Sequence, residues 1–216
     1  MKKARIIAMA AVVLIAALLS GCLSKTWSYD FSDPEADIND WYVENYGAYE
    51  FTVDGLSMSH VNITTPISFS GDMTVIVDFL LSVDVDNNAR LEVGIEDDIL
   101  WDGENYLYAD FWCLGDPESE GWEIEDYSDL TGYIDYERYE QVPGIRYDGS
   151  NTLKMVKTGN QFTMFMNGTK LRTITLEHFA GLSNYVTIFT GENGGDITIK
   201  NIEVKYSGDV TDGPVL

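Results

Sequence analysis

The chain has 216 residues, and its 36 acidic against 13 basic side chains give a formal charge of -23 at pH 7. That length fits one domain, and 45% hydrophobic with 23% charged residues is the composition of a globular protein. Strong negative charge argues against nucleic acid as a partner and against docking on anionic lipid headgroups. We therefore expect one folded domain that binds no nucleic acid.

The first residues differ in composition from the rest of the chain. Lys2, Lys3 and Arg5 precede an apolar, uncharged run over 6–19. A basic start, a short apolar run and small residues before a cleavage site are typical of a secretory signal peptide. A helix of about 14 residues spans roughly 21 Å, which is shorter than the ~30 Å hydrocarbon core of a bilayer. A transmembrane helix is therefore the weaker interpretation.

The signal ends in Leu-Ser-Gly-Cys at 19–22, which closely resembles the lipobox of prokaryotic lipoproteins. This resemblance implies that residues 1–21 are removed and that Cys22 is lipidated with acyl chains such as palmitate. Two or three acyl chains anchor a protein far more firmly than one does. We expect an extracytoplasmic lipoprotein at the outer membrane or cell surface, with the lipid bilayer as one partner and 22–27 as a lipid-anchored tether.

Beyond Cys22 the recurring pattern is alternation of apolar and polar residues between Gly, Asn and Asp, which is typical of strands. Turns are indicated at Asp54-Gly55, Gly159-Asn160 and Asn167-Gly168. The predicted strands are 49–53, 56–60, 63–69, 73–83, 90–95, 106–114, 121–125, 152–157, 161–166, 169–175, 185–190 and 197–206. Short helical turns are predicted only around 34–39 and 176–182. About a dozen short strands predict an all-β, antiparallel sandwich or barrel.

Three stretches then resemble the concanavalin A-like and laminin-G-like jelly rolls. They are the strand, turn and Asn-Gly hairpin over 151–168, the final Ile-Thr-Ile-Lys-Asn-Ile-Glu-Val strand over 197–204, and an opening segment over 29–41. The resemblance implies a jelly-roll β-sandwich over 28–207, followed by a flexible tail over 208–216. It implies a fold but not a function, because lectins, glucanases and adhesion domains share this fold.

Residues 101–148 interleave aromatic side chains with carboxylates. Sugars present apolar C–H faces and hydroxyl groups, so aromatic rings beside carboxylates match their chemistry. The alternative is that the rings fill the core and the acids lie on solvated edges. Our leading prediction is a lectin-like, carbohydrate-binding groove over 101–147. Its predicted ligand-binding residues are Trp101, Tyr108, Asp110, Trp112, Trp122, Glu123 and Tyr136.

An enzymatic alternative starts from Glu123-Ile124-Glu125-Asp126, which resembles the catalytic strand of laminarinase-like glucanases. Retaining hydrolysis needs two carboxyl groups about 5 Å apart, which residues on one face of a strand can supply. However, Glu125 replaces the middle Asp of that motif, and Tyr127 and Ser128 stand where the acid/base Glu belongs. We therefore lean away from an enzyme and keep a glycoside hydrolase using Glu123 and Glu125 as the alternative. A third alternative is a protein-interaction or structural lipoprotein.

A calcium ion is the one cofactor that the sequence suggests. Asp84, Asp86 and Asn88 lie in one short loop that is dense in oxygen donors, the ligands that calcium prefers. The resemblance to jelly rolls also implies a structural calcium, with Asp30, Asp33 and Asp196 as other ligand candidates. A hairpin turn needs Asp and Asn in any case, so the loop has an ordinary explanation as well.

Overall fold

The computed structural model describes residues 24–82, 89–98, 105–114, 120–128, 132–179, 181–191 and 196–213, and almost all of its regular structure is strand. The elements are β1 (Lys25–Asp30), β2 (Tyr42–Thr52), β3 (Gly55–Thr64), β4 (Ile67–Phe69), β5 (Met73–Ser82), β6 (Ala89–Glu96), β7 (Asn105–Leu114), β8 (Gly121–Ser128), β9 (Gly132–Glu140), β10 (Asp148–Thr158), β11 (Gln161–Met166), β12 (Thr169–Thr175), the 3-10 turn η1 (Glu177–Phe179), β13 (Tyr185–Thr190), β14 (Asp196–Tyr206) and β15 (Val210–Asp212). Within these residues no helix is long and apolar enough to cross a membrane.

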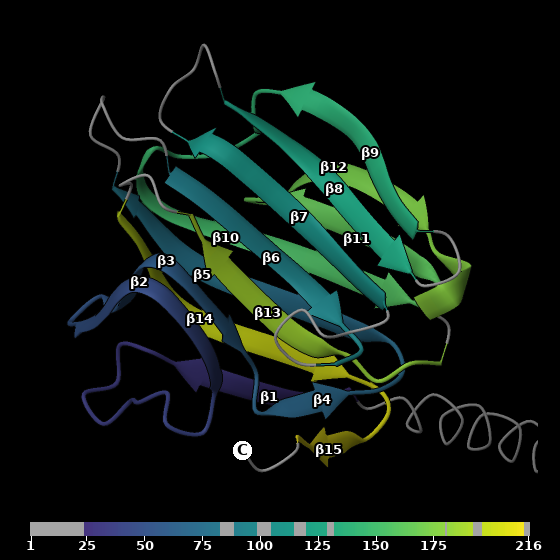
Figure 1. Ribbon diagram of the computed structural model, residues 1–216, viewed down its shortest axis with the longest axis horizontal. Coiled ribbons are helices and arrows are strands. Elements are labelled where there is room, and N and C mark those ends of the chain that lie inside the picture. Colours follow the sequence, from purple (N-terminus) through teal and green to yellow (C-terminus); the bar gives the residue numbers. More distant parts are fainter. Residues whose placement is uncertain are drawn as a thin grey trace, which may run out of the picture.

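The strands form two stacked layers that meet at β3 (Figure 1). One layer, here called the β5 layer, has the order β12-β11-β10-β5-β14, with β1 paired on β14. The other, here called the β6 layer, has the order β13-β6-β7-β8-β9. Every pairing between these strands is antiparallel, which confirms the predicted fold class.

The strand β3 belongs to both layers. Its first half pairs with β14, with Met58 opposite Ile197, and its second half pairs with β13, with Ile63 opposite Ile188. His60 lies between the halves with a positive φ of 55°, an uncommon conformation for a residue other than glycine. The backbone therefore changes course at His60, and the single sheet divides into two layers there.

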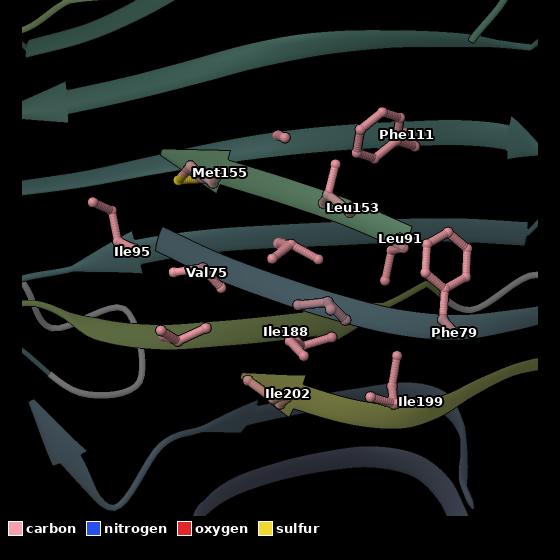
Figure 2. Packing of buried hydrophobic residues seen from close by; sticks show 14 of the residues in the cluster. Val75, Phe79, Leu91, Ile95, Phe111, Leu153, Met155, Ile188, Ile199 and Ile202 are labelled. Atoms are coloured by element: carbon pink, nitrogen blue, oxygen red, sulfur yellow. The ribbon is translucent and has the colours of Figure 1, made fainter. Parts of the chain in front are cut away.

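The core lies between the layers because each strand turns alternate residues inward. In β5, the buried residues recur at every second position from Met73 to Leu81. Figure 2 shows Val75 and Phe79 of this strand close to Leu91 and Ile95 of β6. Burying a side chain of this size contributes about 1.5–3 kcal/mol, so the inward residues supply most of the cohesion between the layers.

The predicted strand boundaries are accurate for β11, β12 and β13 and poor for β2 and β9. The strands predicted over 161–166, 169–175 and 185–190 match β11, β12 and β13. By contrast β9 was not predicted, and β2 is longer than the predicted strand over 49–53. The predicted helical turn over 176–182 contains the 3-10 turn η1, whereas the segment over 34–39 forms turns without a helix.

Both ends of the described chain are more ordered than the sequence suggested. The strand β1 begins at Lys25, inside the predicted tether, because Trp27 packs against Trp41 and Phe69 with ring centroids 5.9 and 5.6 Å apart. Inside the predicted flexible tail, β15 pairs with β4. The sandwich therefore extends beyond the predicted limits of 28 and 207.

Candidate functional site

The outer face of the β6 layer carries an unusual set of side chains. Because Leu91, Val93 and Ile95 of β6 point into the core, their neighbours in the strand point outward. The same alternation applies to β7 and β8. We call this surface the carboxylate face. On these three strands it consists of Arg90, Glu92, Gly94, Glu96, Tyr106, Tyr108, Asp110, Trp112, Glu123, Glu125 and Tyr127.

Strand register brings three carboxylates of this face together. Asp110 lies between Glu92 of β6 and Glu123 of β8, and Glu125 is the next outward residue of β8. One carboxylate oxygen from each of Asp110, Glu123 and Glu125 lies within 4.8 Å of the other two. Three carboxylates this close can hold a hard metal ion or accept several hydrogen bonds from one ligand.

Arg90 is the cation of this cluster. Its guanidinium donates to both oxygens of Asp110 at 3.0 and 2.8 Å, and its Nη2 lies 2.7 Å from Oε1 of Glu92. Charge-assisted bonds in this forked geometry are strong and fix orientation. Arg90 thereby holds two buried carboxyl groups in place while part of its own side chain stays exposed.

The environment of the Glu92 carboxyl group favours its protonated form. Burial, which is the largest cause, and the negative charges of Asp110, Glu125 and Glu123 together raise the pKa of Glu92 to about 8. Arg90 opposes these effects, but its charge is shared with Asp110 and does not outweigh them. The cluster thus has more negative charge than its cation balances, and Glu92 responds by keeping its proton.

A second group of buried polar residues lies beside the cluster. Tyr108 donates its hydroxyl proton to Oε2 of Glu96 at 3.1 Å, and the Thr64 hydroxyl lies 3.4 Å from the other carboxylate oxygen. Thr187 also donates to Glu96. The ring of Tyr108 packs directly over Gly94, where a Cβ atom would lie 2.2 Å from the ring. This part of the face is closed to ligands.

Two of the predicted sugar-stacking residues are buried. Tyr108 is 0% exposed for the reason just given, and Trp122 is 2% exposed on the core face, stacked on Phe111 with ring centroids 6.4 Å apart. Neither presents a ring to solvent, so we correct their predicted role. The core-filling alternative describes them better.

The other predicted site residues fall into two groups. Asp110, Glu123 and Trp112 lie together on the carboxylate face, with Glu125 on the same side of β8. Trp112 is half-buried and lies opposite Gly121, which has no side chain to compete for the space. The prediction for Trp101 lies outside the described residues, as does the side chain of Tyr136, whose backbone belongs to β9.

The predicted metal ligands remain largely untested. Asp84, Asp86 and Asn88 lie outside the described residues, as do Cys22 and the side chain of Asp196. The other two candidates organise turns. Asp30 accepts hydrogen bonds from the amide and hydroxyl of Ser32 at 2.9 and 2.7 Å, and Asp33 accepts one from the amide of Glu35 at 2.9 Å.

The predicted site did not include Arg90 and Glu92, because the stretch of aromatic and acidic residues that defined it runs over 101–148. A usable signal was present in the predicted strand over 90–95, where alternation puts Arg90 and Glu92 on the polar face of the sheet.

A separate cavity of about 450 Å³ lies at the connection between β9 and β10. In its wall, Glu120 accepts hydrogen bonds from the Val142 amide at 2.8 Å and from the Tyr147 hydroxyl.

Comparison with known proteins identifies the fold. No family model and no curated protein matches the chain. Among solved structures, the CBM2 module of the evolved Dit of Lactobacillus casei BL23 phage J-1 has a TM-score of 0.64 at 9% identity, covering 85% of this chain and 96% of that one. The Emp47p carbohydrate recognition domain has a TM-score of 0.60 at 11% identity, covering 87% and 96%. The Crh5 transglycosylase has a TM-score of 0.56 at 13% identity, covering 86% of each chain. The chain is therefore a β-sandwich of the jelly-roll type.

Proposed function

We propose that this protein binds a glycan across the carboxylate face. The observation that carries the proposal is the pair of half-buried carboxylates, Glu123 and Glu125, beside the half-buried ring of Trp112. Asp110 is buried and both of its oxygens accept from Arg90, so the glycan would contact the other two carboxylates. Clustered carboxylates accept hydrogen bonds from adjacent sugar hydroxyls, and an indole ring packs on the apolar face of a sugar. Support also comes from the fold, since one of the similar structures is named as a CBM2 module and another as a carbohydrate recognition domain.

The charge of the site indicates an uncharged glycan. Among the described residues of β6, β7 and β8 on this face, Arg90 is the basic one, and it already holds Glu92 and Asp110. A glycan with uronic acid or sulfate groups would be repelled by the remaining carboxylates at short range. Neutral hydroxyl groups can instead donate to them. We therefore expect neutral glycans to bind more tightly than acidic ones of the same length.

The test is binding of the mature domain to an array of glycans, followed by calorimetry with the best ligand. Trp112→Ala is expected to weaken binding at least tenfold with little change in thermal stability. Phe165→Ala removes a half-buried ring from the outer face of the β5 layer and serves as the matched control, with unchanged affinity. Absence of binding to every neutral glycan, or equal losses in both variants, would overturn the proposal in favour of the protein-interaction alternative.

One observation favours the hydrolase alternative. The oxygens of Glu123 and Glu125 are close enough for retaining hydrolysis, in which one carboxylate attacks the sugar and a second carboxyl group donates a proton. Glu123 would be the nucleophile and Glu125 the acid. Release of reducing ends from β-glucans that is lost in Glu123→Gln would support this alternative.

We further propose that the domain is a lipoprotein anchored through Cys22 outside the cytoplasm. The proposal rests on the sequence at 19–22. Labelling of the expressed protein with a palmitate analogue should be abolished by Cys22→Ser, while Cys113→Ser should leave the labelling unchanged.

A structural calcium remains a prediction. Thermal unfolding with calcium and with a chelator tests it.

A further inference from the structure

Asn62 of β3 is buried with its amide unused. It is 1% exposed, and neither its Oδ1 nor its Nδ2 has a hydrogen-bond partner in the described part of the chain. Buried polar groups in folded proteins are nearly always paired, because an unpaired one loses its hydration without compensation. A donor and an acceptor on one side chain are both unpaired here, which calls for an explanation.

The side chain of Asn62 points to the carboxylate face. Its neighbours in the strand, Val61 and Ile63, belong to the core, and Thr64, two residues on, reaches Glu96 on the outer side. Strand register places Asn62 in one row across the sheet with side chains of the site. In order, this row is Glu44, Asn62, Phe189, Glu92, Asp110 and Glu123.

Asn62 therefore lies two strand spacings from Glu92, about 10 Å along the row. Rings are grouped at this end of the row. The Phe189 ring contacts His60 with centroids 6.0 Å apart, and His60 contacts Tyr46 at 5.3 Å. Tyr46 is 63% exposed, while Glu44 and Phe189 on either side of Asn62 are half-buried. Phe189 is the cross-strand neighbour of Asn62, so a ligand would reach the buried amide only after side chains beside it move.

We propose that Asn62, with Phe189 and Tyr46, forms a second sugar subsite on the carboxylate face. Its Nδ2 donates to one hydroxyl of a sugar unit, and its Oδ1 accepts from an adjacent hydroxyl. Neighbouring hydroxyls satisfy both atoms because each can donate and accept, whereas an anion can accept only. The unit bound here is a neighbour of the one at the carboxylate cluster. This inference rests on the proposed glycan function.

The test compares short and long ligands. For wild type, affinity is expected to rise at least tenfold from the shortest oligosaccharide that binds to one that is two or three units longer. Asn62→Leu, which removes both unpaired atoms, should abolish that rise while leaving the affinity for the short ligand and the thermal midpoint undiminished. Thr190→Val is the matched control. It removes another buried unpaired oxygen, but on the core side, and should leave affinity for both ligands unchanged.

A second pair of variants guards against misfolding of Asn62→Leu. Tyr46→Ala should lose part of the gain with length, and Tyr49→Ala, a 41% exposed ring on the same strand, should keep it. A full gain with length in both Asn62→Leu and Tyr46→Ala would overturn the subsite and leave the proposed function intact. Absence of wild-type binding to every ligand would instead overturn the proposed function.

Discussion

The outer faces of the two layers differ although both are built from alternating strands. On β5, β10 and β11, every described outward side chain is half-buried or exposed, and charges of both signs are mixed with threonines. On the β6 layer, Glu92, Glu96 and Asp110 are buried on the outward side. Burying carboxyl groups is costly, so a face that does so has a use for them beyond solubility.

The charged side chains of the two outer faces also differ in how far their contacts are open to solvent. On the β5 layer, Asp78 accepts a hydrogen bond from Thr152 at 2.6 Å, and Lys154 lies over the ring of Phe165. These are local contacts between side chains that solvent can replace. On the carboxylate face, Glu92 is buried and depends on its contact with Arg90, because water cannot replace that partner. For a charged side chain, an outward position on a strand therefore matters less than how deeply its neighbours bury it.

The largest effect is expected from Arg90→Met. Removing the guanidinium leaves Glu92 and Asp110 buried without their cation. Loss of one partner of a buried ion pair destabilises a protein by about 3–5 kcal/mol. The exposure of Arg90 points to the lower value. Urea unfolding measures the change. Lys154→Met on the other outer face should change stability by less than about 0.5 kcal/mol, and equal losses would show that the two faces do not differ.

Gly94→Ala should have the next largest effect. The added Cβ would overlap the ring of Tyr108 and the carbonyl oxygen of Leu107, and overpacking of this kind costs about 1–3 kcal/mol. Val156→Ile adds a methyl group to the half-buried outer face of the β5 layer, and it should leave the thermal midpoint nearly unchanged. A midpoint for Gly94→Ala equal to wild type would contradict the close packing of Tyr108.

The pH dependence of Glu92 gives a smaller effect with a defined sign. Between its usual pKa of 4.5 and its folded pKa of about 8, the folded state holds a proton that the unfolded state has lost. Its contribution to stability is therefore complete below about pH 4.5 and is lost as the pH rises through 8, by at most about 1.4 kcal/mol per pH unit. Glu92→Gln should flatten the unfolding free energy between pH 5 and 8. Parallel profiles for the two proteins would refute the protonation of Glu92.

The smallest effect is expected from Thr152→Val. It removes the hydrogen bond to Asp78, but Asp78 is half-buried and regains water, so the loss should be about 0.5–1 kcal/mol. Glycan affinity, measured by calorimetry, should not change, because this residue lies on the other outer face. A reduced affinity would show that the two faces are coupled.

The sequence predicts strands with clear alternation or a marked turn better than strands that lack both. Alternation is clear in β5, where one face is buried along the whole strand, and the Asn167-Gly168 turn marks the boundary between β11 and β12. It is weak in β9, which ends the sheet, and in β2, most of which is exposed. The strand β12 also ends the sheet, but the Asn167-Gly168 turn marks where it begins, so its bounds are predicted correctly.

The candidate site was only partly predictable for a related reason. Alternation alone places Glu123 and Glu125 on one face, and it also places Trp122 on the opposite one. The predicted binding residues therefore included Trp122 and Glu123 together, although alternation places these neighbours on opposite faces of the strand. The proximity of Asp110 to Glu123 depends on register between β7 and β8, and the burial of Tyr108 depends on Gly94 of another strand. One sequence does not reveal either of these pairings.

The sharing of β3 between both layers has a consequence for how the molecule opens. Its amide and carbonyl groups bond to β14 over Leu56–Met58 and to β13 over Val61–Thr64, with β2 along its other edge. Neither layer can detach without releasing this strand. Amide protons of β3 should therefore exchange with deuterium only through global unfolding, whereas those of β9 and β12, at the two ends of the sheet, should exchange through local fraying.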